Sequence, residues 1–363
     1  MQSQAQTEKK IILVGNPNVG KSVVFNTMTG SYTTVSNYPG TSVEVSRGQC
    51  EIAGEHYQVL DTPGMYSLLP ITEEERVARR ILLEESPHVV VHVIDARNLE
   101  RMLPMTLQLI EAGLPVVLLI NIMDEAERVG MHVDIALLQE KLQIPVVGGA
   151  MGRAKRGLWE LRDAIRDFKV SKATFNYATD LEKDIHGISK LMQGDYTLNR
   201  RSLTLMLLQR DEEIAERVKA REGDRYESVE KAVNDTVFDR RVDLHLRISL
   251  ERKRICKGLL DGVISQKDGN QQTFADHVSN WTMNPWTGVP LLLIVLYLGL
   301  YQFVGGFGAG TIVDFLEGTI FEEYLNPWVI GLCEKYIPWY WLNELLVGEY
   351  GLFTLGVRYA VAI

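Results

Sequence analysis

A glycine-containing run near the amino terminus has the residue types that bind phosphate. Residues 15–22 read GNPNVGKS and fit the pattern G-x-x-x-x-G-K-[ST]. Glycines let the backbone fold around phosphate oxygens, and successive N–H groups at a helix start attract the anion. Lys21 supplies a charge near the β and γ phosphates, and Ser22 offers a hydroxyl to Mg²⁺. A chance glycine-rich turn is the alternative. The predicted phosphate contacts are Gly15, Asn16, Pro17, Asn18, Val19, Gly20, Lys21 and Ser22.

A second motif, DTPG at residues 61–64, follows a predicted β-hairpin. The hairpin strands are residues 49–52 and 56–60, joined by a turn at residues 53–55. Asp61 can hold Mg²⁺ through water, and the N–H of Gly64 can sense a γ-phosphate. The predicted contacts here are Asp61, Thr62, Pro63 and Gly64.

A third motif, NIMD at residues 121–124, selects the base. A carboxylate at Asp124 can accept hydrogen bonds from N1 and the 2-amino group of guanine, but it would repel the N1 acceptor of adenine. The motif therefore predicts GTP rather than ATP. Taken alone, Asp124 could instead be a helix N-cap. The predicted contacts are Asn121, Ile122, Met123 and Asp124.

The segment between the first two motifs, residues 36–44, is a candidate switch loop. A loop here would close over Mg²⁺ and the γ-phosphate and relax after hydrolysis. Thr41 and Ser42 are both candidate Mg²⁺ ligands, and ordinary turn hydroxyls are the alternative. The predicted contacts are Gly40, Thr41, Ser42, Val43 and Glu44.

The elements that must position these motifs are short apolar runs separated by helical patterns. Residues 11–14, 89–94 and 116–120 are continuous, largely β-branched runs, and residues 145–147 form a shorter one. Such runs are typical of strands buried on both faces. With a helix predicted at residues 23–28, the pattern indicates an α/β nucleotide-binding fold of the P-loop type, with a mostly parallel sheet and helices on both faces.

The remainder of the chain changes character twice. Residues 176–270 are charged and amphipathic, which predicts an all-α segment. Residues 281–313 carry no charged side chain, and this stretch is long enough to cross a bilayer. A buried helix of a soluble domain is the alternative. Basic residues at 252–257 precede the span, so the front of the chain is expected on the cytoplasmic side. The acidic residues at 314–323 are expected in a solvated loop, with an iron relay as the alternative. A second apolar region, 336–363, suggests a partial or re-entrant span.

Composition excludes several classes of protein. The net charge of −9 argues against a broad nucleic-acid interface, so no nucleic-acid partner is expected. The three cysteines are far apart and odd in number, as expected in a reducing compartment, and show no metal-ligand spacing. The amino terminus lacks the apolar core and cleavage site of a signal peptide.

Together, the four site segments resemble the G domain of the ferrous iron transport protein B (FeoB) family. Residues 207–213, LLQRDEE, resemble the cytosolic helical domain of that family, and residues 286–290, WTGVP, resemble its entry into the first membrane helix. The resemblance implies residues 1–9 as a tail, 10–170 as the G domain, 176–270 as a helical domain like a guanine-nucleotide-dissociation inhibitor, and 281–363 as a membrane region truncated relative to the family.

The resemblance also implies individual roles. Ser42 matches the Mg²⁺-binding switch threonine of the family, and Thr41 is the substitute after a small shift. Asn18 matches the asparagine that helps to hold K⁺ in potassium-activated members. Tyr38 stands where a tryptophan is common. The guanine-binding loop of the family usually carries a Ser-Ala pair. In this region, Gly149, Ala150 and Met151, the pair Ala150-Met151 occupies that place, and its backbone N–H groups could reach guanine O6.

The predicted function is therefore a GTP-binding and GTP-hydrolysing module, cytoplasmic, of a ferrous iron transporter in the bacterial inner membrane. By resemblance its partners are the membrane, Fe²⁺ as the transported ion and the remaining permease, either in the same protein or as a separate chain; a homo-oligomer is left open. The alternative is a membrane-attached regulatory GTPase without transport. A soluble ribosome-assembly GTPase is disfavoured by the acidic charge.

The residue after Gly64 bears on the rate of GTP hydrolysis. Met65 stands where many regulatory GTPases place a water-orienting glutamine, so intrinsic hydrolysis should be slow. We expect K⁺, held at Asn18 and the switch loop, to stabilise the developing charge as an arginine finger would. GTP turnover measured in K⁺ should exceed that in Na⁺. Equal rates, or an Asn18→Ala variant that keeps full stimulation, would contradict this. The residues expected to carry hydrolysis are Asn18, Lys21, Ser42 and Gly64.

Overall fold

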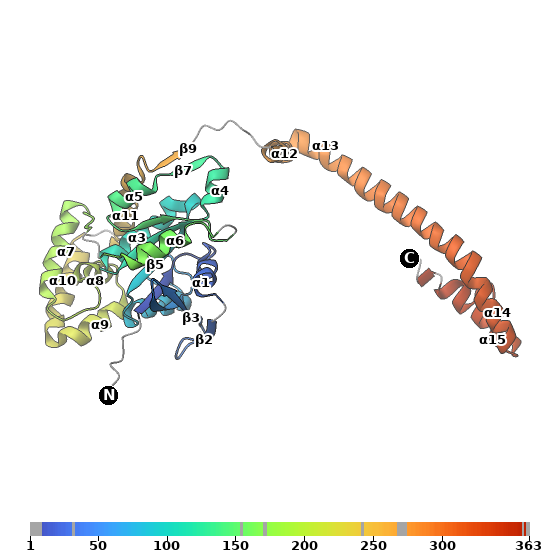
Figure 1. Ribbon diagram of the computed structural model, residues 1–363, viewed down its shortest axis with the longest axis horizontal. Coiled ribbons are helices and arrows are strands. Elements are labelled where there is room, and N and C mark those ends of the chain that lie inside the picture. Colours follow the sequence, from blue (N-terminus) through green and yellow to red (C-terminus); the bar gives the residue numbers. More distant parts are fainter. Residues whose placement is uncertain are drawn as a thin grey trace. The chain divides into compact units, whose positions relative to one another are not determined.

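The structure is a computed structural model that describes residues 9–30, 33–152, 155–169, 173–240, 243–266, 274–357 and 359–360. The chain divides into two compact units, residues 1–268 and 269–363. The first unit contains a sheet with its helices and a second group of helices, and the described part of the second unit is helical (Figure 1).

A seven-stranded sheet forms the centre of the first unit, in the order β2-β3-β4-β1-β5-β6-β8. Strands β4, β1, β5, β6 and β8 are parallel, whereas β3 runs antiparallel to β4 and β2 antiparallel to β3. The mostly parallel sheet predicted from the apolar runs is confirmed. The strands are β1 Lys9–Val14, β2 Thr33–Asn37, β3 Glu44–Ile52, β4 Glu55–Asp61, β5 Val89–Asp95, β6 Val116–Asn121 and β8 Val146–Gly148.

The hairpin predicted before the DTPG motif is present. Strands β3 and β4 are joined by Ala53 and Gly54, which both have positive φ, as the twist of a two-residue hairpin requires. Edge strand β2 was not predicted, because all five of its residues are exposed and its sequence, TTVSN, has no buried alternation. The expected switch loop is therefore the tip of a second hairpin, between β2 and β3.

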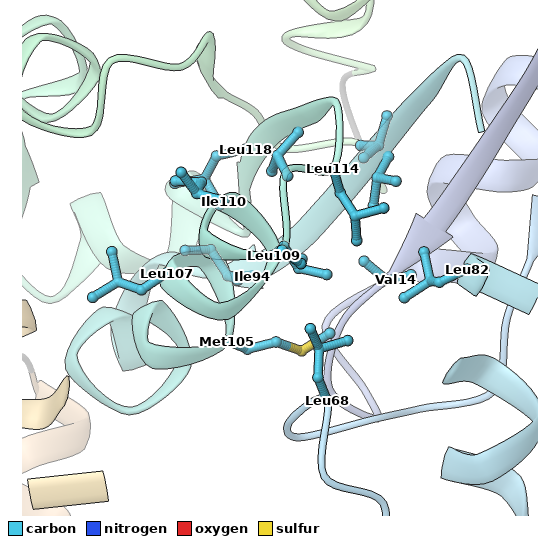
Figure 2. Close-up of a cluster of buried hydrophobic side chains, with 14 of the residues drawn as sticks. Val14, Leu68, Leu82, Ile94, Met105, Leu107, Leu109, Ile110, Leu114 and Leu118 are labelled. Carbon is cyan, nitrogen blue, oxygen red and sulfur yellow. The ribbon is translucent and has the colours of Figure 1, made fainter. Parts of the chain in front are cut away.

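Helices cover the sheet and supply its core. They are α1 Lys21–Thr29, α2 Glu73–Glu84, the 3-10 turn η1 Ala96–Asn98, α3 Leu99–Glu111, α4 Met123–Arg128, α5 Ile135–Leu142 and α6 Leu158–Arg166. Figure 2 shows Leu82 of α2, Met105 and Leu109 of α3 and Val14 of β1 among the clustered apolar side chains. Strands β5 and β6 are buried at every residue because both of their faces are covered, which explains their uninterrupted apolar sequences.

Five helices follow, as the amphipathic pattern predicted. They are α7 Thr179–Leu191, α8 Arg200–Leu208, α9 Glu212–Glu222, α10 Tyr226–Arg240 and α11 Leu244–Leu260, with a 3-10 turn η2 Gly223–Arg225. Helix α8 is buried from Ser202 to Leu208 and forms the centre of this group. A small two-stranded sheet was not predicted: β9 Ile264–Gln266 pairs antiparallel with β7 Met131–Val133.

Buried ion pairs join these helices to the sheet-covering helices. Arg79 of α2, whose side chain is 3% exposed, binds Asp211 and Glu213 at the start of α9. Glu111 of α3 binds Arg252 of α11 at 3.3 Å. Removing one partner of such a pair costs about 3–5 kcal/mol, because the other charge is left buried. The two groups of helices are thus held together as one unit.

Among its described residues, the second unit contains one helix that is long and apolar enough to cross a membrane, judged by length and composition: Pro285–Tyr336. It comprises α13 Pro285–Val295, the π-helical segments η3 Leu296–Ile312 and η4 Phe315–Leu325, and α14 Asn326–Tyr336. The acidic residues 314–323 are expected in a solvated loop, and that expectation is wrong: they continue the helix. The next proline, Pro327, stands at the start of α14, a position that a helix tolerates. The flanking elements are α12 Phe274–Met283, α15 Tyr340–Val347 and η5 Leu352–Val357.

Candidate nucleotide site

The sheet topology brings the sequence motifs to one edge of the sheet, the one formed by the carboxyl ends of the parallel strands. Strands β4, β1, β5, β6 and β8 are neighbours and run parallel, so their carboxyl ends lie on the same side. The phosphate loop follows β1, the DTPG motif begins at the last residue of β4, the NIMD motif begins at the last residue of β6, and residues 149–151 follow β8. Ligands of parallel α/β sheets bind at this edge.

The phosphate loop has backbone that only glycine accommodates well. Gly15 and Gly20 have φ of +146° and +88°. A Cβ on Gly15 would lie 2.2 Å from the carbonyl oxygen of Val93, and one on Gly20 would lie 2.5 Å from Nδ2 of Asn121. Helix α1 then begins without a side-chain cap or an acidic residue in its first turn. Its first amides are therefore available to an anion.

Lys21 is directed into the loop rather than into solvent. Its side-chain Nζ donates to the carbonyl oxygens of Gly15 and Asn16, both at 3.1 Å, and the residue is 8% exposed. Burial lowers the pKa of Lys21, and the nearby Asp61 carboxylate opposes that shift. A buried cation held by two neutral carbonyl groups is well placed to gain stability from a phosphate.

Ser22 and Asp61 form an oxygen-donor pair that fits Mg²⁺. The Ser22 hydroxyl donates to Oδ2 of Asp61 at 2.8 Å. The other carboxylate oxygen, Oδ1, is buried and has no hydrogen-bond partner among the described residues. Burial raises the pKa of Asp61, and Ser22 and Lys21 oppose the shift. Mg²⁺ is a hard cation that binds oxygen ligands, usually including one or two carboxylates, so this pair fits it.

The DTPG segment is fastened to the phosphate loop. The Thr62 hydroxyl donates to the carbonyl oxygen of Leu13 at 2.8 Å, and the Met65 N–H donates to that of Gly15 at 3.1 Å. A Cβ on Gly64 would lie 2.6 Å from the ring of Pro17. The Met65 side chain is fully buried.

Asn121 joins the phosphate loop, residues 15–22, to the candidate base loop, residues 149–151. Its Nδ2 donates to the carbonyl oxygen of Val19 at 3.0 Å, and its Oδ1 accepts from the N–H of Met151 at 3.1 Å. The Met123 N–H donates to the carbonyl oxygen of Gly149 at 3.1 Å, so the NIMD motif and the loop after β8 are linked twice. Asp124 lies half-buried in the first turn of α4.

In the candidate base loop, residues 149–151, two amides are bonded within the protein. The N–H of Ala150 donates to the carbonyl oxygen of Arg156 at 3.0 Å, and that of Met151 is used by Asn121. Both amides are thus engaged within the protein, and a contact from either to guanine O6 remains a prediction. Their hydrogen bonds depend on the path of the loop, which residue types do not reveal.

The candidate switch ligands stay within their own turn. The Thr41 hydroxyl donates to the carbonyl oxygen of Tyr38 at 2.9 Å, and Ser42 is exposed. Among the described residues, neither bonds to Ser22 or Asp61. Asn18 is also exposed, with φ of +63°, a conformation that asparagine tolerates. The roles of these three residues in binding Mg²⁺ or K⁺ remain predictions.

Two residues at this edge were not singled out from the sequence. Asp95 ends β5 directly opposite Asn121 of β6, and Arg97 lies two positions later. A polar residue at the end of a buried strand is a usable signal, because the carboxyl ends of parallel strands converge.

The fold is that of a P-loop GTPase: a mostly parallel sheet, a glycine-bounded phosphate loop leading into α1, and the DTPG and NIMD motifs in sequence order at one edge. The chain belongs to the ferrous iron transport protein B family. The model of that family matches residues 9–165, and the model of the FeoB cytosolic helical domain matches residues 177–265.

Similar curated proteins are the Fe(2+) transporter FeoB of Escherichia coli K12 and a fusion of Fe(2+) transport protein A with Fe(2+) transporter FeoB from Porphyromonas gingivalis W83. The first is 32% identical over 326 residues, which are 86% of this chain and 41% of that protein. The second is 28% identical over 358 residues, 93% of this chain and 41% of that protein. The chain thus spans about two fifths of the length of these relatives.

Solved structures show the same fold. The apo cytosolic domain of T. maritima FeoB matches 71% of this chain and 100% of its own, with 27% identity and a TM-score of 0.62. A GDP-bound mutant of the S. thermophilus FeoB G-domain matches 71% and 100%, with 28% identity and a TM-score of 0.64. The T. maritima domain is also known in a GMPPNP form.

The contact between Gly20 and Asn121 can be tested directly. A Gly20→Ala variant places a methyl group 2.5 Å from Asn121 Nδ2 at a φ of +88°. We expect GDP affinity to fall at least about tenfold, because the loop must shift at a cost above roughly 1.4 kcal/mol. The measurement is calorimetric titration, with thermal unfolding to show that the variant folds.

The control for this variant is Gly54→Ala. Gly54 has a similar φ of +83°, but a Cβ there would meet no atom within 4 Å, and the residue lies in the β3–β4 turn. It should lose stability without losing affinity. Equal losses of affinity in both variants would contradict the proposed role of the contact.

Proposed function

We propose that this chain is the GTP-binding and GTP-hydrolysing cytoplasmic part of a ferrous iron transporter in a bacterial inner membrane. The proposal depends most on the Asn121 side chain, which belongs to the NIMD motif and bonds to both Val19 of the phosphate loop and Met151 of the candidate base loop. These bonds favour a single site for phosphate and base. The similarity of the chain to proteins called Fe(2+) transporter supports ferrous iron as the transported ion. In this proposal residues 10–170, 176–270 and 281–363 act as G domain, helical domain and membrane region.

The proposed binding mode follows from the chemistry of each group. The amides of residues 15–22 and Lys21 would hold the phosphates, and Ser22 with Asp61 would hold Mg²⁺. Mg²⁺ there would neutralise charge on the β and γ phosphates. The Asp124 carboxylate would accept from N1 and the 2-amino group of guanine. Asn18 would contribute to a K⁺ site.

Closing of the switch loop would require a rearrangement. For Thr41 or Ser42 to reach Mg²⁺, the turn closed by Tyr38 N–H on the carbonyl oxygen of Val43, at 2.8 Å, has to open. The strand register supports the need for a rearrangement. Ser46 is the residue paired with Asp61, and Ser42 precedes Ser46 by four residues, so Ser42 is not beside Asp61 in this register. With Met65 buried, hydrolysis would be slow in the absence of a further charge.

A carboxylate at the end of α2 links this turn to the helical domain. The Tyr38 hydroxyl donates to Oε2 of Glu84 at 2.8 Å, and Arg217 of α9 binds Oε1 of Glu84 at 3.1 Å. Arg217 also binds Glu213, the partner of Arg79. Burial and then Glu84 raise the pKa of Tyr38 to about 12, so its hydroxyl stays a donor. Opening of the turn would break the first of these bonds and so be sensed by α9.

Base selectivity is the direct test. The 363-residue chain in detergent, titrated with GTP, GDP and ATP with and without Mg²⁺, should prefer guanine nucleotides by at least about a hundredfold, since a site built to hydrogen-bond a base rejects one that leaves its groups unpaired. Asp124→Asn should lose most of that preference, whereas Asp235→Asn, an exposed change on α10, should keep it. Equal affinity for GTP and ATP would refute the proposal.

The transport part has its own readout. Uptake of ferrous iron into cells should be lost with Asp124→Asn when the chain acts with its permease. Guanine-selective binding together with unchanged uptake would instead indicate a membrane-attached regulatory GTPase.

The proposed coupling is tested by nucleotide release. Tyr38→Phe removes only the hydroxyl bound to Glu84, and Arg217→Gln removes the other bond to the same carboxylate. Each should change the GDP dissociation rate about twofold to fivefold, and the double variant should show little further change, as expected for one shared network. Stopped-flow release of a fluorescent GDP measures this, with Tyr66→Phe, an exposed tyrosine, as the control. Additive effects, or no effect, would contradict the coupling.

A further inference from the structure

A buried carboxylate at the end of β5 holds an arginine in a defined position. Asp95 is 5% exposed and accepts from the Arg97 N–H at 2.9 Å, from Arg97 Nη2 at 2.8 Å and from Asn98 Nδ2 at 3.2 Å. Burial opposes ionisation of Asp95, but the bonds from Arg97 outweigh it and hold the pKa of Asp95 below its usual range. The guanidinium is therefore anchored from one side.

The same guanidinium reaches helix α4. Arg97 Nη1 donates to Oε2 of Glu125, the residue directly after Asp124 in the first turn of that helix. Glu127, farther along α4, binds Arg156 at 2.9 Å. Helix α4 is thus attached by charged groups to β5 on one side and to the segment after β8 on the other.

External attachment matters here because α4 starts from a strained residue. Ile122, directly before the helix, has φ of +62°, which costs a β-branched side chain about 1–3 kcal/mol. The helix extends only over Met123–Arg128, too short to be stable alone. Contacts made by its first turn, rather than its own hydrogen bonds, therefore determine where Asp124 lies.

We propose that Arg97 is a positioning residue for guanine recognition. Through the Asp95–Arg97–Glu125 bridge it fixes the first turn of α4 against the end of β5, so that both carboxylate oxygens of Asp124 face N1–H and the 2-amino group of the base. This inference rests on the proposed guanine-nucleotide site. It assigns to Arg97 no contact with the ligand.

The exposed half of the bridge limits the size of the effect. The side chains of Arg97 and Glu125 are 41% and 47% exposed, and such a pair is weak on its own. Anchoring by Asp95 reduces the side-chain freedom lost when the pair forms, so it holds Glu125 better than a free surface arginine would.

The test compares GDP with IDP, which lacks the 2-amino group. The ratio of their affinities measures the contact of Asp124 with that group. In the 363-residue chain in detergent, Arg97→Gln should lower the GDP:IDP affinity ratio about threefold to fivefold, the range expected for a partly exposed charged bridge, and change IDP binding less than about twofold. Arg128→Gln, an exposed arginine on the same helix, is the matched control and should leave the ratio unchanged.

A second variant tests whether Arg97 and Glu125 act through the same bridge. Glu125→Gln should lower the ratio as Arg97→Gln does, and the double variant should add little. An unchanged ratio in Arg97→Gln, or an equal loss for GDP and IDP, would overturn the inference while leaving the proposed function intact. If the unsubstituted chain failed to prefer GDP over ADP, the proposed function would fail, and the inference with it.

Discussion

The site depends on one buried carboxamide. Asn121 uses its NH₂ group on the phosphate loop at Val19 and its oxygen on the base loop at Met151. Neither partner is near it in sequence, and the residue lies at the end of a fully buried strand. Because an unpaired buried amide is costly, both loops are held to the geometry that satisfies it. Gly20 leaves the space that this side chain needs.

Charge organises the surroundings of that bridge at two levels. Close to the site, burial shifts the pKa values of Lys21 and Asp61 and disfavours their charged forms. A phosphate beside Lys21 and Mg²⁺ beside Asp61 would stabilise those charged forms. Farther away, Arg79 and Glu111 bind partners in α9 and α11, so the helical group cannot separate from the sheet without exposing buried charges. Glu84 connects the two regions, since it binds Tyr38 of the switch turn and Arg217 of α9.

Sequence reasoning worked where a local pattern has a single structural solution. Continuous apolar runs became strands β1, β5, β6 and β8, and the glycine-bounded loop leads into α1 as expected. It failed where pairing depends on distant residues. Strand β2 has no apolar face, and β7 and β9 are three-residue strands that meet only in the folded chain. The sequence does not indicate the helix through residues 314–323, because acidic residues after an apolar run favour a solvated loop.

By itself the sequence determined which residues could bind a nucleotide, because phosphate loops and base-reading carboxylates are defined by residue type at fixed spacing. It also determined the order of α/β, helical and apolar segments, since hydrophobic periodicity is a local property. Only the tertiary structure decided that Asn121 bridges two loops, that the Ala150 and Met151 amides are engaged within the protein, and that Asp95 and Arg97 support α4. These contacts join residues from different strands, and their geometry exists only once the parallel sheet has aligned the strand ends.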